Sequence, residues 1–275
     1  MTVAHPLASF EGHLRTTMGG CFPGERAVMR GLDIHAALRD ADWMDMYLFA
    51  ITGRRHTPAQ LRVLHAIWTN TSYPDARLWN NRVAALAGST RSTGILGISA
   101  ALAVSEASIF GGQVELAVAD FLVRARQAME SGSDLADIVT EELRVNRGIG
   151  GYGRPVGRSR PDERNDVVVG IARQEGLANG IYLKLAYAVE GILLSGRWRM
   201  RMNYAAIATA LSLDLGLSPR EYYLYMLPAF LAGMPPCYIE AAERPQQATF
   251  PLRCTSLSYE GAPRRSWAES ASGHG

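Results

Sequence analysis

The sequence predicts an all-α protein, because apolar residues recur at helical spacing and clear helix start signals precede them. The best-formed apolar face carries Leu61, Leu64, His65 and Trp68 at i, i+3, i+4 and i+7. Residues 218–221, SPRE, combine a capping box with proline at the first helical position. Apart from the short stretch 197–203, no run of residues alternates between apolar and polar as a strand does.

The composition is that of a globular protein that can bury a large core, as one domain or as two lobes. The chain has 275 residues, 48% hydrophobic and 20% charged, with a net charge of +2. This small charge indicates no nucleic-acid partner. The first residues lack the pattern of a signal peptide, and polar residues interrupt the apolar run at 94–110, so we expect a cytoplasmic protein that does not enter the membrane.

The cysteines indicate neither a disulfide framework nor a metal site. Cys21, Cys237 and Cys254 are odd in number, widely spaced and without a CxxC pair. We therefore expect no bound metal.

Helices are expected to follow one another along the chain. After a polar leader, residues 21–31 are expected to form a loop and residues 32–38 a short helix. Further helices are expected at 43–49 (capped by Asp40 or Asp42), 58–68 (after Thr57-Pro58), 78–86, 114–122, 135–139, 166–172, 181–194, 202–213 and from 218 onward. Residues 197–203 alternate arginine with apolar residues and suggest a short extended piece. Pro235-Pro236 is expected to end the helix from 218, and the tail from 258 to be disordered.

Two features inside these helices bear on where a site can lie. Small residues dominate residues 84–107, so we expect a hairpin of helices packed backbone to backbone at the centre of the protein. His65 lies on an apolar helix face. A histidine there is expected to be a hydrogen-bonded core residue rather than a catalyst.

The stretch best suited to ligand binding is residues 148–164, GIGGYGRPVGRSRPDER. Glycines allow close approach of the backbone, and arginines offer forks of donors that fit carboxylates and phosphates, so the stretch predicts an anion site. It also contains a GxGxxG spacing, which binds dinucleotides only between a strand and a helix. The residues before it are helical in character and Pro155 follows Arg154, so we reject the dinucleotide interpretation. Arg158 and Arg160 are expected to be exposed.

An all-helical chain with this hairpin, then FGG, then a GGYGRxV turn resembles the citrate synthase superfamily, and within it most the citryl-CoA lyase domain of ATP-citrate lyase. The motifs are residues 110–112, 150–156, the NxxV of 80–83 and Arg244-Pro245, and the resemblance spans about residues 30–245. It implies a large helical domain and a smaller helical lobe. The implied divisions are a leader (1–20), the first part of the large domain (21–112), the small lobe (113–200), a return to the large domain (201–255) and a disordered tail (256–275).

The resemblance also implies ligands and partners. It implies a coenzyme A thioester as co-substrate, a carboxylate that is a 2-oxo or hydroxy acid, and no tightly bound cofactor. It further implies a homodimer or higher homo-oligomer whose sites are completed by the partner chain.

The proton-handling residues of the family, two histidines and an aspartate, are replaced in this chain. The matching positions carry Ser72, Arg154 and Asn203. Phe110, implied to lie against the substrate, stands before the two glycines where the synthases have a histidine. Arginine cannot be deprotonated in a protein, and asparagine has the shape of aspartate without its basicity. Standard citrate synthase or citryl-CoA lyase chemistry is therefore not expected, although Arg154 can stabilise an oxyanion.

The binding residues implied by the resemblance are retained. Arg164 matches an arginine that clamps a carboxylate, and Arg244 matches one that reaches across the dimer. Gly150, Gly151, Tyr152 and Gly153 match backbone that lies against the thioester. Asp75, expected near the substrate, and Tyr73 and Tyr152 are candidates for a replacement base. For Asp75 a turn role stays open, and for the tyrosines a packed role with a satisfied hydroxyl.

Two functions follow from this pattern. The first is an enzyme that forms or cleaves a carbon-carbon bond on a coenzyme A thioester with altered residues. The second is a pseudoenzyme that binds such ligands, or a partner protein, without turnover. The polar replacements at positions 154 and 203 favour the enzyme.

Overall fold

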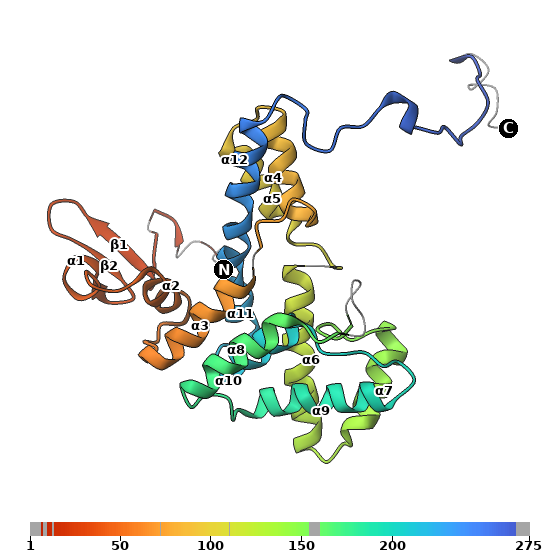
Figure 1. Cartoon of the computed structure of the whole chain (residues 1–275). Coiled ribbons are helices and arrows are strands. Elements are labelled where there is room, and N and C mark those ends of the chain that lie inside the picture. The colour runs from red at the N-terminus through yellow and green to blue at the C-terminus, as the bar shows by residue number, and fades with distance from the viewer. Residues whose placement is uncertain are drawn as a thin grey trace, which may run out of the picture.

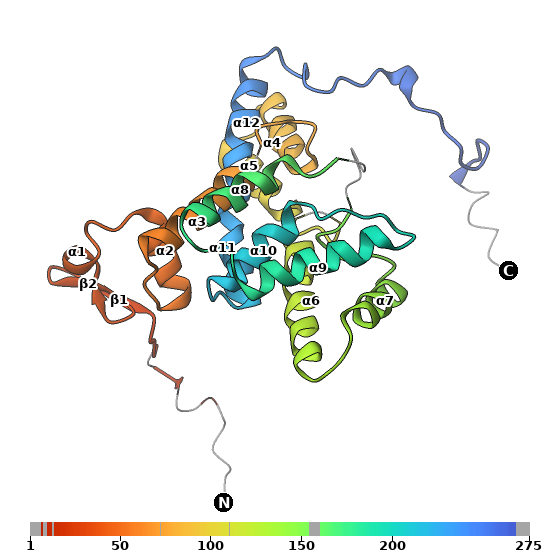
Figure 2. The ribbon, with the colours of Figure 1, turned by 60° about the horizontal axis from the view of Figure 1, so that its bottom comes forward.

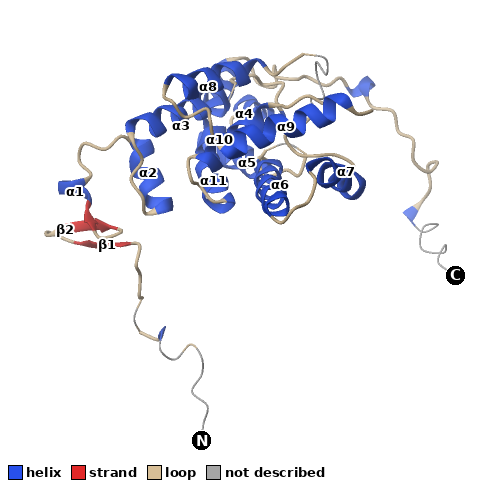
Figure 3. Ribbon diagram, turned by 90° about the horizontal axis from the view of Figure 1, so that it is seen from below, coloured by secondary structure: helices blue, strands red, loops and turns tan. Residues whose placement is uncertain are grey.

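The computed structural model describes residues 7, 10–12, 14–71, 73–109, 111–153 and 160–267. Within these ranges most regular structure is helical, and the strands form one small sheet at the edge of the molecule (Figure 1, Figure 3). The prediction of an all-α fold is confirmed, with this sheet as an addition.

The elements follow one another in simple order. The strands are β1 (Gly19–Phe22), β2 (Arg26–Met29) and β3 (Leu32–Asp33). The first helices are α1 (Ile34–Ala37), α2 (Trp43–Thr52), α3 (Pro58–Thr71), α4 (Trp79–Ser89), α5 (Gly94–Val104) and α6 (Gly112–Glu130). The remaining helices are α7 (Leu135–Asn146), α8 (Glu163–Gln174), α9 (Ile181–Ser195), α10 (Tyr204–Asp214), α11 (Pro219–Met226), the 3-10 helix η2 (Leu227–Gly233), α12 (Met234–Glu243) and η3 (Cys254–Ser256).

The small sheet corrects the expected loop at 21–31 and the expected helix at 32–38. β1 pairs antiparallel with β2, and β2 with β3, and only residues 34–37 are helical. Arg30 (φ 46°) and Gly31 (φ 85°) both lie in the left-handed region, as a two-residue type I′ hairpin turn requires. Strands of two to four residues are too short to show the alternation from which a strand is predicted.

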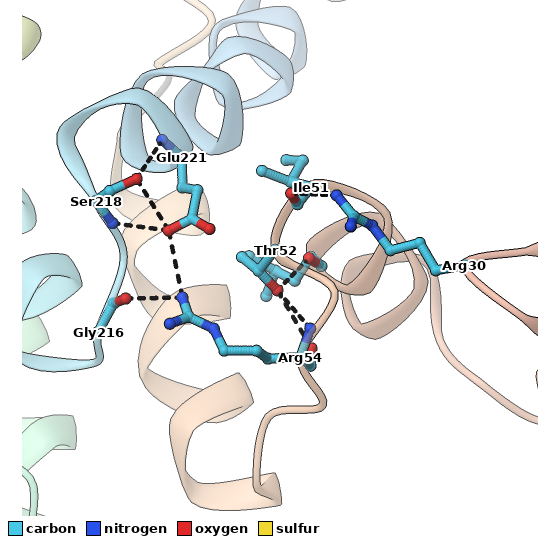
Figure 4. A network of polar contacts seen from close by, with 8 residues as sticks. Arg30, Ile51, Thr52, Arg54, Gly216, Ser218 and Glu221 are labelled. Carbon is cyan, nitrogen blue, oxygen red and sulfur yellow. Dashed lines mark hydrogen bonds and ion pairs between the residues drawn. The ribbon is translucent and has the colours of Figure 1, made fainter. Parts of the chain in front are cut away.

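A polar network joins this N-terminal part to the helical body (Figure 4). Arg54, just after α2, donates from Nη2 to the carbonyl oxygen of Gly216 (2.7 Å) and to Oε2 of Glu221 (3.3 Å). Glu221 belongs to the capping box with Ser218 that begins α11, so the predicted box is confirmed. Arg30 donates to carbonyl oxygens at the end of α2, which ties the sheet to that helix.

Helix α3 begins at Pro58 as predicted, but His65 is not in the core. The buried stripe of the helix runs through Val63, Leu64 and Ile67. His65 is exposed, with Nε2 3.7 Å from Oδ1 of Asp42. The expectation of a core histidine is wrong, because the buried face of α3 includes Val63 and Ile67 and leaves His65 at its exposed side.

Helix α10 is the centre of the main core. Nearly every one of its residues is buried, and it contacts α3, α6, α8, α9 and α11 (Figure 2). A helix that is apolar on all sides is a buried helix. The start of α10 lies beside that of α8, because Asp162, the N-cap of α8, accepts from the N–H of Tyr204.

A second, smaller group contains α4, α5 and α12, which lie together at one end of the molecule (Figure 1). Their backbones approach closely, as predicted. A Cβ atom added at Gly88 would lie 2.3 Å from the carbonyl oxygen of Tyr238, and one at Gly97 would lie 2.5 Å from Cβ of Ala87. Glycine is required at both positions for this approach.

The expectation that this hairpin lies at the centre of the protein is wrong. On α5 only Gly97 and Ala101 are buried, whereas Ile95 is 81% and Leu96 65% exposed. Helical spacing identifies an apolar helix but not what covers each of its faces. In the single chain, one face of α5 is uncovered.

The two prolines near the C-terminus also have a role different from the one predicted. Pro235 and Pro236 stand in the first turn of α12, and the chain between α11 and α12 continues as η2. Proline is tolerated in a first turn because no helical hydrogen bond is lost there. Beyond α12 the chain leaves the helical body (Figure 1). Among the helices of the described ranges, none combines the length and the apolarity needed to cross a lipid bilayer.

Candidate anion-binding site

The glycine turn is joined to the start of α10. Tyr152 and Met202 form an antiparallel bridge. The N–H of Asn203 donates to the carbonyl oxygen of Gly151 (2.8 Å), and the N–H of Gly153 donates to that of Arg201 (2.7 Å). The extended piece expected at 197–203 is thus present at its end, and helix α7, not a strand, precedes the turn. The rejection of a dinucleotide site is consistent with this arrangement.

The turn needs glycine for its own packing. Gly151 has φ +83°, and a Cβ there would lie 2.9 Å from Cβ of Ala206 on α10. At Gly150 a Cβ would lie 3.1 Å from Cγ2 of Val118 on α6. The glycines therefore let the turn lie directly on α6 and α10.

Asn203 uses its whole side chain within this junction. Its Oδ1 accepts from the N–H of Ala205 (3.0 Å) and caps α10, and its Nδ2 donates to the carbonyl oxygen of Gly153 (2.9 Å). Asparagine supplies both the acceptor and the donor that these two bonds need, whereas an ionised aspartate has no donor. Asn203 is therefore a residue that fixes the turn on the helix.

Arg164 is the cation at the centre of the site. It donates from Nε and Nη2 to the two oxygens of Asp162, both at 2.8 Å. Its guanidinium carbon lies 4.4 Å from the ring centroid of Tyr204 and 5.6 Å from that of Tyr73. Burial works to lower the pKa of Arg164, but the hydrogen bonds and charge of Asp162 outweigh it, and the pKa is raised. The guanidinium stays charged and is held in one orientation.

Three helices begin around this guanidinium. Arg164 is in the first turn of α8, Tyr204 is the first residue of α10, and Glu115 is in the first turn of α6. Asp162, which caps α8, also accepts from the N–H of Tyr204 (3.1 Å). Helix N-termini carry partial positive charge and attract anions. Together with Arg164 they make this junction electropositive, and the carboxylate of Asp162 already pairs with it.

Glu115 is a buried carboxyl within this positive surrounding. It is 6% exposed, and its Oε2 has no hydrogen-bond partner among the described residues. Burial raises the pKa of Glu115 to about 8, and the charge of Arg164 limits the rise. The site thus contains a carboxyl that keeps its proton near neutral pH.

The other expected site residues have different surroundings. Asp75 accepts from Arg77 Nη2 (2.7 Å) and from its N–H (2.8 Å), and these hydrogen bonds lower the pKa of Asp75 to about 2. This geometry favours the turn role left open for it. The hydroxyl of Tyr152 donates to the carbonyl oxygen of Ala186 (2.9 Å), which favours the packed role, and burial raises its pKa.

Arg244 lies at the end of α12 and belongs to a separate cluster. Its guanidinium pairs with Glu240, and its carbonyl oxygen accepts from Arg91 (2.8 Å). The expected contributions of Ser72, Phe110 and Arg154 fall on positions outside the described residues. Arg158 lies outside them as well, and Arg160 is exposed as expected.

Sequence reasoning missed Glu115, Asp162 and Tyr204. Asp162 gave a signal, since an aspartate before Glu163 at a helix start is a typical N-cap. Glu115 gave none, because an acid in the first turn of a helix is usually exposed and stabilises the dipole. The described residues contain no group of three or more His, Cys, Asp or Glu side chains placed to hold a metal ion.

The helical architecture with this junction is a citrate synthase-like fold, and solved structures of that class match it over most of the chain. The chain matches citryl-CoA lyase from Hydrogenobacter thermophilus with a TM-score of 0.80 and 18% identity, over 94% of this chain and 98% of that chain. ATP citrate lyase from Methanothrix soehngenii, solved with citrate and coenzyme A, matches with a TM-score of 0.70 and 18% identity, over 94% of this chain and 44% of that chain.

Citrate synthase from Thermoplasma acidophilum, solved with carboxymethyl coenzyme A and oxaloacetate, matches with a TM-score of 0.60 and 21% identity, over 83% of this chain and 60% of that chain. At these identities the likeness shows the fold. The resemblance in the sequence motifs is thereby confirmed at the level of fold. Neither the family models nor the sequences of curated proteins give a match to this chain.

Proposed function

We propose that this protein binds a carboxylic acid, a 2-oxo or hydroxy acid, together with an acyl-CoA thioester, and forms or cleaves a carbon-carbon bond between them with non-standard catalytic residues. The observation that carries the proposal is the meeting of three helix N-termini around Arg164, beside the glycine turn. A guanidinium fork fits a carboxylate by geometry and charge.

The fold neighbours support the ligand classes. Two of them are described with coenzyme A or its carboxymethyl derivative, and with citrate or oxaloacetate. On this proposal, the carboxylate meets the donors of Arg164 that Asp162 does not use, and the thioester lies along the glycine turn at 150–153. Coenzyme A is a co-substrate that leaves after each turnover, so no tightly held cofactor is required.

A second candidate is a pseudoenzyme that binds the same ligands or a partner protein, and one observation favours it. Asn203 stands where the resemblance puts the basic aspartate, and both polar groups of its side chain are used to cap α10 and to hold Gly153. A residue used in this way takes no proton from a substrate. Binding without turnover is then the outcome, unless another group handles the proton.

We propose in addition that two or more copies of the chain assemble. The uncovered face of α5, with Ile95 and Leu96, supports this, because contiguous exposed apolar surface in a globular protein marks an interface. Arg244, which is exposed at the end of α12, is then available to a neighbouring copy, as the resemblance implies.

The test is a binding and turnover assay on the purified chain. Thermal shift is measured with acetyl-CoA, other acyl-CoAs, coenzyme A and a set of di- and tricarboxylates, since a specific ligand raises the melting temperature. Turnover is then followed as coenzyme A release from acetyl-CoA with a 2-oxo acid, and as cleavage of citryl-CoA. Binding with turnover supports the enzyme, and binding without bond change supports the pseudoenzyme. Absence of binding by every ligand would contradict both.

A further inference from the structure

Glu115 differs from the other buried carboxyl groups of the described chain. Asp45 is paired with Arg55 (2.6 Å) and Asp162 with Arg164 (2.8 Å). Glu115 is buried to the same degree, yet its Oε2 has no hydrogen-bond partner among the described residues. Burying an unpaired carboxylate is so costly that the group keeps its proton instead. Glu115 is therefore expected to be a neutral carboxylic acid, whose Oε2 makes no hydrogen bond to the described residues.

The groups that face Glu115 come from three helices. They are Arg164 on α8, Tyr204 on α10, and Tyr222 and Tyr225 on α11. Tyr204 donates its hydroxyl to the carbonyl oxygen of Ile67 (2.7 Å). The hydroxyl of Tyr225 donates to the carbonyl oxygen of Leu64 (2.6 Å). The charged group among the four is Arg164, so the protonation state of Glu115 responds to the charge at the anion site.

The residues at the positions that match the family's proton carriers are poor acids and bases. Arg154 holds its proton at all relevant pH values, Asn203 is not a base, and the hydroxyl of Ser72 alone is no general acid at neutral pH. Asp75, a candidate replacement base, is ionised through its bonds to Arg77, which lower its pKa to about 2. Glu115, with a pKa of about 8, is matched to proton transfer near neutral pH. It also lies in the first turn of α6, which begins at Gly112.

We propose that Glu115 is the acid of this site, which donates a hydrogen bond and then its proton to an anionic oxygen of the ligand held by Arg164. In this step the O–H bond of Glu115 breaks, the electron pair stays on the Glu115 oxygen, and a new O–H bond forms on the ligand. The negative charge left on Glu115 then faces Arg164. The inference rests on the proposed function, because it needs an anionic ligand at that arginine.

Proton-linked binding tests the proposal. Citrate binding to the full chain is measured by calorimetry between about pH 7 and about pH 9.5, in buffers of different ionisation enthalpy. If binding requires protonated Glu115, the affinity falls roughly tenfold per pH unit above the pKa, and binding takes up close to one proton there. Glu115→Gln has the shape of the neutral acid. It is expected to bind citrate with no proton uptake and with an affinity that is independent of pH over this range.

Asp214→Asn is the matched control. Burial raises the pKa of Asp214 also, but its carboxylate accepts from the N–H groups of Tyr182 and Leu183 (both 2.9 Å) and faces Arg126. This variant should keep the wild-type pH dependence of binding.

The outcomes separate this inference from the proposed function. Citrate binding that is independent of pH in the wild type overturns the role of Glu115 and leaves the ligand class intact. A failure of citrate, oxaloacetate and coenzyme A to bind the wild type overturns both. Carboxyl NMR of the unliganded protein gives a ligand-free check, and a Glu115 resonance that titrates at an ordinary value near 4.5 also overturns the role of Glu115.

Discussion

The guanidinium of Arg164 lies on the ring of Tyr204, with its carbon 4.4 Å from the ring centroid. The first residues of α8 and α10, far apart in the sequence, are thereby held against each other. The carboxylate of Asp162 accepts hydrogen bonds from both the Arg164 side chain and the Tyr204 N–H, so it links the starts of α8 and α10. This junction orients the cation that the proposed function requires.

Loss of Arg164 should weaken carboxylate binding. We expect Arg164→Ala to lower the affinity for citrate roughly 10- to 100-fold, since hydrogen bonds to charged groups contribute about 1.5–3 kcal/mol. Calorimetry measures the change. Arg164→Lys keeps a positive charge beside the buried carboxylate of Asp162 but lacks the guanidinium fork. It should also bind citrate more weakly than the wild type does. Arg160→Ala, at an exposed neighbour, should bind within about twofold of wild type. Equal losses of citrate affinity in the Arg160 and Arg164 variants would show that the binding site is not at Arg164.

The stability of the wild type should depend on the charge state of Glu115. The unfolded chain loses this proton near 4.5, and the folded chain keeps it to about 8. Because the pKa of Glu115 is higher in the folded chain, its protonation stabilises the fold fully below pH 4.5. This stabilisation is lost as the pH rises from 4.5 through 8. We expect the melting temperature of Glu115→Gln, relative to wild type, to increase steadily from pH 5 to pH 8.5. A difference that does not change with pH would mean that Glu115 titrates normally.

The glycine turn should tolerate no side chain at its contact with α10. Gly151→Ala is expected to destabilise the protein by about 1–2 kcal/mol for positive φ and by roughly 1–3 kcal/mol more for overpacking against Ala206. Gly132→Ala is the control, since Gly132 has φ +94° and nothing within 4 Å of an added Cβ. Urea unfolding measures both. Equal destabilisation in the two variants would show that the close approach of Gly151 to Ala206 has no energetic importance.

Assembly should depend on the uncovered face of α5. We expect Ile95→Glu to convert an oligomer to a monomer, because a charge buried in an apolar interface loses its hydration. Sedimentation velocity gives the oligomeric state. Val145→Glu on α7, where the apolar side chain is also exposed, should leave assembly unchanged. A wild type that sediments as a monomer, or an Ile95 variant that still assembles, argues against this face as the interface.

Local signals in the sequence predicted the helix starts well. The caps at Asp42, Thr57 and Ser218 are present because a cap is made by residues three positions apart. The motifs also pointed to the correct fold. The burial of α5 and the position of His65 were not predictable, because they depend on which elements cover each helix face.

The candidate site was predictable only in part. The turn and Arg164 carry a chemical signature in their glycines and arginines, and the structure brings Gly151, Gly153 and Asn203 together. The acid at Glu115 depends on α8, α10 and α11 closing over it, which no spacing in the chain encodes. Asp75 and Tyr152 carry groups that suit a base, whereas their hydrogen bonds favour a turn role for Asp75 and a packed role for Tyr152.

A crystal structure of the chain with citrate and coenzyme A tests the proposed site most directly. We expect a citrate carboxylate within hydrogen-bond distance of the Arg164 guanidinium, with coenzyme A along residues 150–153. Citrate bound elsewhere, with Arg164 still contacted only by Asp162, Tyr73 and Tyr204, would contradict it.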